Sequence, residues 1–104
     1  MAEDLELKKA FFIESMEILE RLDGDIDAME ASPKSLEVVN SVFRGLHTIK
    51  GNSSFLGLDQ ITKLSHAAET LLDKARKSEI PVNSYLLQIV RKVFSDLKVM
   101  IGEQ

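Results

Sequence analysis

Apolar residues recur along this chain at intervals of three, four or seven positions, in four separate stretches. That spacing places them along one side of a helix, and no stretch alternates with a period of two for long enough to predict a strand. In the first stretch, residues 3–31, the expected inward-facing residues are Leu5, Phe12, Met16, Leu19, Ile26 and Met29. In the second, residues 33–55, they are Leu36, Val39, Phe43, Leu46 and Ile49.

The third stretch, residues 59–77, and the fourth, residues 83–101, repeat the helical pattern. Their expected inward-facing residues are Ile61, Leu64, Ala68, Leu71, Leu72 and Ala75, then Leu86, Ile89, Val90, Val93, Leu97 and Met100. Short links between amphipathic helices favour antiparallel neighbours. The pattern therefore predicts an all-α fold, an antiparallel up-and-down four-helix bundle.

Residues that favour turns and helix ends mark the links. Ser32 is expected to cap the second helix, with Pro33 as its first residue, because proline there leaves no additional donor unsatisfied. Gly57 is expected just beyond the end of that helix. Asp59 is expected to cap the third helix, and Pro81 interrupts the chain before the fourth.

Composition narrows the class of protein. The chain has 104 residues, enough for one domain with a modest core, and its net charge of -4 argues against nucleic-acid binding. It has no cysteine, which excludes disulfides and thiolate chemistry and permits a reducing cytoplasm. No apolar run approaches the roughly 20 residues that span a bilayer, so no membrane insertion is expected.

One face of the second predicted helix carries candidate chemistry. The residues that share this face, at positions i, i+3, i+4 and i+7, are His47, Lys50, Gly51 and Ser54. A neutral imidazole is a competent nucleophile near neutral pH. Lys50 would offset charge on an incoming anion, and Gly51 would let a bulky partner approach. Together these features suit a phosphoryl group that arrives and leaves by in-line transfer.

The third predicted helix offers a second set of polar residues. His66 and Glu69 are three positions apart and lie off its apolar stripe. If this helix packs beside the second, the Glu69 carboxylate could accept the Nδ1 proton of His47. That contact would select one tautomer and leave Nε2 as the attacking atom.

Three segments of the chain carry a family resemblance. Residues 43–58 read FRGLHTIKGNSSFLGL, residues 64–76 read LSHAAETLLDKAR, and residues 11–22 read FFIESMEILERL. The first is similar to the phosphorylation-site segment of histidine phosphotransfer (HPt) domains, and the others resemble the next helix and the opening helix of that family. More narrowly, the chain resembles the N-terminal phosphotransfer domain of CheA-type chemotaxis histidine kinases. The resemblance covers essentially the whole chain.

The resemblance implies a role for each matching residue. His47 matches the histidine that is phosphorylated on Nε2, and Glu69 matches the glutamate hydrogen-bonded to that imidazole. Lys50 matches the lysine beside the phosphorylated histidine, where it would balance phosphoryl charge. His66 matches a nearby second histidine, which either tunes the acceptor or is structurally neutral. Gly51 matches the first glycine of the motif.

The same resemblance implies an activity and its partners. The domain, residues 1–104, would receive the γ-phosphoryl group of ATP from the catalytic domain of a histidine kinase and pass it to an aspartate of a response regulator receiver domain. Partners would dock over Gly51 and Ser54, although Ser54 stands where glycine is frequent in the family. No cofactor or metal is expected in this domain, since ATP and Mg²⁺ would bind to a separate kinase domain. The chain would be a cytoplasmic, monomeric carrier, a fragment of a longer kinase and no enzyme by itself.

Other interpretations of the same residues remain. A metal-binding bundle would use His47, His66 and Glu69 as ligands, yet Lys50 beside that site would repel a cation. A helical interaction module without chemistry would tolerate His47→Gln, whereas a phosphoryl carrier would not. Phe43, one turn before His47, is expected in the core rather than on a docking surface.

Overall fold

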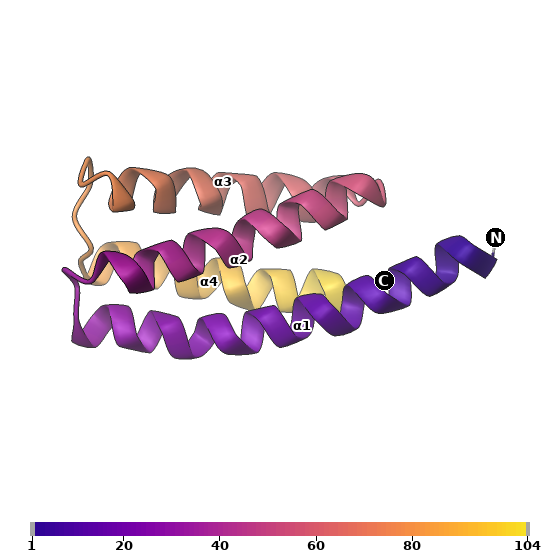
Figure 1. Cartoon of the computed structure of the whole chain (residues 1–104), viewed down its shortest axis with the longest axis horizontal. Helices are drawn as coiled ribbons and strands as arrows, with labels where there is room; N and C mark the ends of the chain where they lie inside the picture. Colours follow the sequence, from indigo (N-terminus) through magenta and orange to yellow (C-terminus); the bar gives the residue numbers. More distant parts are fainter. Residues whose placement is uncertain (1, 104) are drawn as a thin grey trace.

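The computed structural model describes the backbone of residues 2–103 and the side chains of residues 5–103. Its four helices, in chain order, are α1 (Ala2–Ala31), α2 (Leu36–Phe55), α3 (Asp59–Arg76) and α4 (Ser84–Gly102). Successive helices run antiparallel, and α1 and α3 each contact both α2 and α4 (Figure 1). The described residues contain no strand. The predicted all-α, antiparallel up-and-down four-helix bundle is confirmed.

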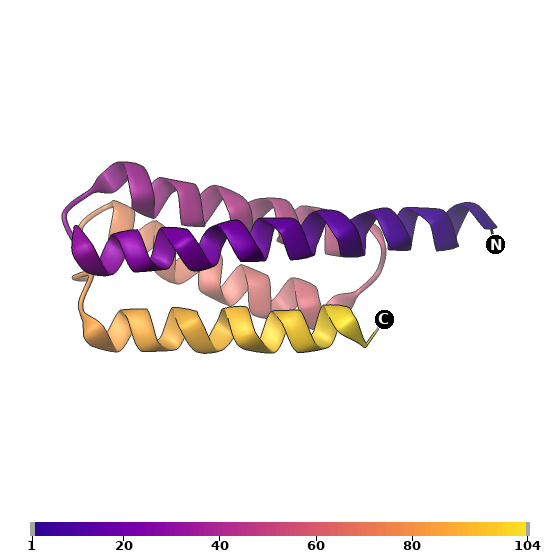
Figure 2. The same ribbon diagram turned by 90° about the horizontal axis from the view of Figure 1, so that it is seen from below.

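Helix α1 is longer than its neighbours, and its N-terminal end projects past the rest of the bundle (Figure 2). Its 30 residues account for most of the 46 Å long axis, because an α-helix rises about 1.5 Å per residue. Leu5, on the projecting part, was predicted to face inward and is instead exposed. No helix reaches far enough to cover it. Leu36, in the first turn of α2, was likewise predicted inward and is exposed.

The core side of α1 differs by one position from the prediction near its N-terminal half. Phe11 and Ser15 are buried there, whereas Phe12 and Met16 are only partly buried. The cause is Ser15, which is completely buried one turn before the core residue Leu19 and hides the apolar period in the sequence. Leu22, further along the helix, is also buried and was not predicted to face inward. The fully buried large side chains of the core are Leu19, Leu22, Ile26, Met29, Val39, Leu46, Ile49, Ile61, Leu72, Phe94, Leu97 and Ile101.

The start of α2 was predicted wrongly. The helix begins at Leu36 with Ser35 at the N-cap position, rather than at Pro33 with Ser32 as its cap. The Ser35 N–H donates to the Ser32 carbonyl oxygen at 3.0 Å, which closes a turn with Pro33 at its second position. Proline is favoured at that position of a β-turn because its φ is already set. The proline therefore serves the turn and not the helix.

Helix α2 ends at the predicted glycine. Gly57 has a φ of 71°, and its N–H donates to the Ser54 carbonyl oxygen at 3.1 Å. The Leu58 N–H donates to the Ser53 carbonyl oxygen at 2.9 Å, so the two bonds form a Schellman motif. Asp59, predicted as the cap of α3, is instead its first helical residue. This short link returns the chain directly along α2.

Candidate functional site

The antiparallel pairing of α2 with α3 determines which residues meet. When a short link joins two antiparallel helices, residues that are equally far from the link lie opposite one another. Lys50 on α2 thus meets Glu69 on α3, and Phe43 meets Arg76, seven residues further along each helix. A row of polar and aromatic side chains results where these two helices face each other.

Glu69 binds two side chains of α2 at once. Its Oε2 lies 2.6 Å from Nδ1 of His47, and its Oε1 accepts a hydrogen bond from Nζ of Lys50 at 2.7 Å. The contact that the sequence suggested between Glu69 and His47 is present. The carboxylate uses one oxygen for each partner, so it holds both side chains in defined positions.

The ionisation of Glu69 follows from these contacts. Burial raises the pKa of Glu69. The hydrogen bonds from Lys50 and His47, together with their charges, lower it by more, so the pKa of Glu69 lies below the ordinary value of 4.5. Near neutral pH the carboxylate is therefore ionised and can only accept hydrogen bonds. Nδ1 of His47 must then carry the proton that it donates to Oε2. In the neutral ring this leaves the lone pair on Nε2.

Exposure differs sharply within this group. The side chain of His47 is 62% exposed, whereas that of Glu69 is 11% exposed and that of Lys50 is 25% exposed. Because Nδ1 faces Glu69, the opposite edge of the ring, with Nε2, points away from α3. The arrangement exposes one unprotonated nitrogen, Nε2, on a ring whose other nitrogen is hydrogen-bonded to Glu69.

Phe43 and Arg76 extend the site beyond the residues that the sequence predicted. The ring of Phe43 is parallel to that of His47 within 16°, with 6.2 Å between their centroids. Cζ of Arg76 lies 4.2 Å from the centre of the Phe43 ring, and its Nε donates to Oδ1 of Asp73 at 2.6 Å. Phe43 was predicted to be a core residue; it is partly buried against the core and also contacts His47.

Sequence reasoning missed Arg76 and Asp73. A signal for them was present, because Glu69, Asp73 and Arg76 follow one another at i, i+4 and i+7 and so share one face of α3. Phe43, at i−4 from His47, has the matching position on α2. That the Phe43 side of α2 meets the Arg76 side of α3 follows only from the register in which the two helices pack.

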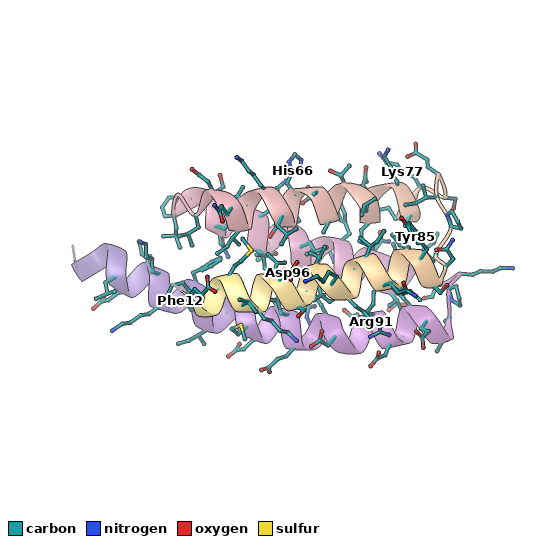
Figure 3. The ribbon with its side chains drawn as sticks, turned by 180° about the vertical axis from the view of Figure 1, so that it is seen from behind. Phe12, His66, Lys77, Tyr85, Arg91 and Asp96 are labelled. Carbon is teal, nitrogen blue, oxygen red and sulfur yellow. The ribbon has the colours of Figure 1, made fainter. Side chains whose placement is uncertain are left out.

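His66 does not join this group. Its side chain is exposed and points away from the other helices (Figure 3). Among residues 5–103, no hydrogen bond, ion pair or ring contact connects the His66 ring with His47, Lys50 or Glu69. The metal-binding alternative needed His66 to converge with His47 and Glu69. The described part of the chain brings no three histidine, aspartate or glutamate side chains together in a manner that could hold a metal ion.

The two residues predicted for the docking surface are both exposed. Gly51 and Ser54 lie on α2 beyond His47, towards its C-terminal end. A Cβ atom placed on Gly51 would meet nothing within 4 Å. The fold itself therefore has no steric need for glycine at this position.

An exposed histidine that is hydrogen-bonded to a carboxylate on a four-helix bundle is the arrangement that the sequence resemblance to phosphotransfer domains implies. The family model of the Hpt domain matches residues 6–100, and the chain belongs to that family. It is similar to the sensor histidine kinase CheAY of Helicobacter pylori, with 38% identity over 96 residues, which are 92% of this chain and 12% of that protein. Chemotaxis protein CheA of Bacillus subtilis is 32% identical over 91 residues, 88% of this chain and 14% of that protein.

Solved structures agree with the sequence relatives. The CheA phosphotransferase domain from Thermotoga maritima superposes with a TM-score of 0.91 at 35% identity, covering 94% of this chain and 93% of that one. The phosphorylated P1 domain of CheA3, solved in complex with CheY6 from R. sphaeroides, gives a TM-score of 0.87 at 26% identity, covering 94% of this chain and 77% of that one. The chain spans 12% to 15% of the length of its CheA relatives. Within residues 2–103, no helix has the length and apolarity needed to cross a membrane.

Proposed function

We propose that this chain is the phosphoryl carrier of a chemotaxis-type histidine kinase. His47 accepts the γ-phosphoryl group of ATP and then donates it to an aspartate of a response regulator. The observation that carries the proposal is the hydrogen bond between Nδ1 of His47 and Oε2 of Glu69, on a ring that is 62% exposed. Membership of the Hpt family supports the same chemistry.

In the first step the lone pair of Nε2 forms a bond to the γ-phosphorus while the bond from that phosphorus to the bridging oxygen of ADP breaks. The imidazole gains positive charge as the N–P bond forms, since Nδ1 keeps its proton. Glu69, ionised and 2.6 Å from Nδ1, stabilises that charge. Its contact with Lys50 leaves a cation near the ring that can approach the transferred phosphoryl oxygens.

In the second step an aspartate oxygen of the response regulator attacks the same phosphorus. The N–P bond breaks and its electron pair returns to Nε2, which regenerates the neutral ring with its proton still on Nδ1. Glu69 acts in both steps, because it stabilises the positively charged ring and leaves the proton on Nδ1. The phosphorylated state of CheA3 and its complex with CheY6 support a response regulator as the partner.

The remaining chemistry is assigned to other domains. We infer that ATP and Mg²⁺ bind to a separate, cytoplasmic kinase domain, and that this chain has no turnover of its own. Residues 1–104 are then a substrate and carrier domain within a longer kinase, which is consistent with the small share of each CheA relative that they match.

The decisive experiment mixes the chain with a CheA kinase core and γ-labelled ATP. Wild type is expected to gain label that is stable in alkali and lost in acid, as an N–P bond requires, and to lose it when a receiver domain is added. His47→Gln is expected to take up none. His66→Gln is the matched control, because it removes the other histidine of the chain, whose side chain is exposed and points away from the other helices. Equal labelling of wild type and His47→Gln would favour the interaction module instead.

Glu69→Gln tests the orienting role separately. Glutamine keeps the shape and can accept a hydrogen bond, but it lacks the charge that stabilises the ring cation. We expect uptake to fall by about ten- to a hundredfold, the loss of one charge-assisted contact at about 1.4 kcal/mol per factor of ten. Single-turnover labelling by quench flow measures this rate.

A further inference from the structure

The hydrogen bond to Glu69 restrains the His47 ring at one edge only. The side-chain torsions of the histidine still fluctuate around that one contact, and rocking of the ring plane changes the direction of the Nε2 lone pair. An exposed histidine on a helix has few neighbours to prevent this. A second contact on the ring would narrow the range of directions that the Nε2 lone pair takes.

Phe43 supplies a contact of that kind. Its ring is nearly parallel to the imidazole, with 16° between the planes and 6.2 Å between the centroids, an offset stack within the range of favourable aromatic pairs. Because Phe43 precedes His47 by one helical turn, the two rings stay in register for as long as α2 is helical. The phenyl ring is anchored, since it is partly buried against the core.

Arg76 restrains Phe43 from α3. Its guanidinium carbon lies 4.2 Å from the centre of the phenyl ring, close enough for a cation–π contact. Arg76 is itself held by Asp73, whose Oδ1 accepts from Nε at 2.6 Å and whose Oδ2 lies 2.9 Å from Nζ of Lys77. Side chains at the C-terminal end of α3 therefore contact one turn of α2 through Phe43.

We propose that Phe43 and Arg76 are positioning residues for the phosphoryl-accepting nitrogen. The chain of contacts Asp73–Arg76–Phe43–His47 limits rocking of the imidazole plane, in addition to the hydrogen bond between Nδ1 and Glu69. Neither residue needs to touch the phosphoryl group. The inference rests on the proposed function for its kinetic part, and its structural part stands on the ring geometry alone.

The test measures the ring and the reaction separately. Carbon-13 relaxation of the His47 Cε1–H bond gives an order parameter for the imidazole without any partner. Phosphoramidate, a small phosphoryl donor that needs no docking, gives the intrinsic rate of His47 phosphorylation. We expect Phe43→Leu to lower the order parameter and to slow phosphorylation by about three- to tenfold, the range that one aromatic pair supports. Arg76→Gln should act in the same direction by about two- to fivefold.

Conservative variants and matched controls separate positioning from general loosening. Phe43→Tyr and Arg76→Lys keep the ring and the cation and should restore most of the order and the rate. Phe12→Leu removes another partly buried phenyl ring, and Arg91→Gln removes an arginine that pairs with Asp27 on the far side of the bundle. Neither control should alter the His47 ring.

The outcomes are distinct. An unchanged order parameter in Phe43→Leu overturns the inference, as does an equal loss in Phe12→Leu. Should Phe43→Leu fail to fold, Arg76→Gln tests the same stack through a partly exposed side chain. If wild type took up no phosphoryl group at all, the proposed function would fail, and the order parameters would still decide whether Phe43 and Arg76 hold the ring.

Discussion

Replacing Gly51 with alanine should make the domain more stable and a poorer carrier. Gly51 lies within α2, is exposed, and would present its new Cβ to open space, with no atom within 4 Å. The substitution therefore gains the whole difference in helix propensity between the two residues, about 0.8 to 1 kcal/mol. For a domain of this size that corresponds to a rise in Tm of about 4 °C.

The same substitution should hinder the close approach of a partner to His47. Gly51 is one turn beyond His47, so a methyl group there would stand beside the exposed imidazole, where the proposed function brings a kinase domain or a receiver close. Overpacking one methyl group in a tight contact costs about 1 to 3 kcal/mol. We expect transfer from a kinase core and to a receiver to slow by about tenfold, while phosphorylation by phosphoramidate is unchanged because that donor is small.

Gly24→Ala provides the matched control. Gly24 lies within α1, and its Cβ would also meet nothing within 4 Å, so the gain in stability should be the same and transfer should not change. Because the two positions share no contact, the double variant should show the sum of both gains. Thermal unfolding followed by circular dichroism and single-turnover transfer assays measure the two effects. A Gly51→Ala domain that transfers at the wild-type rate would show that no partner approaches this part of α2 closely.

Three further perturbations test other contacts. Because the pKa of Glu69 is lowered in the folded state, its contribution to stability is present above about pH 4.5 and is lost as the pH falls through the folded-state pKa. Urea unfolding should therefore show that the free energy of unfolding falls more on acidification in wild type than in Glu69→Gln. Ser78 has a φ of 59° after the last turn of α3, and Ser78→Gly should raise the free energy of unfolding by about 0.5 to 1 kcal/mol in the same assay. A Cβ on Gly45 would lie 2.8 Å from a methyl carbon of Leu22, so Gly45→Ala should lower it by about 1 kcal/mol, the overpacking cost less the gain in helix propensity. A stabilised Gly45→Ala would mean that Leu22 relaxes freely.

Local rules failed where the sequence contained two plausible answers. Ser32-Pro33 fits a helix start, but the same dipeptide fits a turn, and the Ser35 N–H to Ser32 carbonyl bond shows which was used. Ser15 is polar and yet completely buried, and the prediction for the N-terminal half of α1 was wrong by one residue, whereas Leu19, Ile26 and Met29 were predicted correctly. Leu5 was placed correctly on its helix, but exposure depends on whether another helix reaches it.

The sequence by itself determined the four helices, because a period of 3.6 is written into the order of apolar residues, and it determined the candidate face of His47, Lys50 and Gly51, because spacing along one helix decides which side chains share a side. Contacts between helices depend on register and on side-chain direction, which no local pattern encodes. Only the packing of α3 against α2 brought Glu69 to Nδ1 of His47, left His66 outside, and set Arg76 over Phe43. An acceptor nitrogen can be located from one helix, but its orientation comes from two.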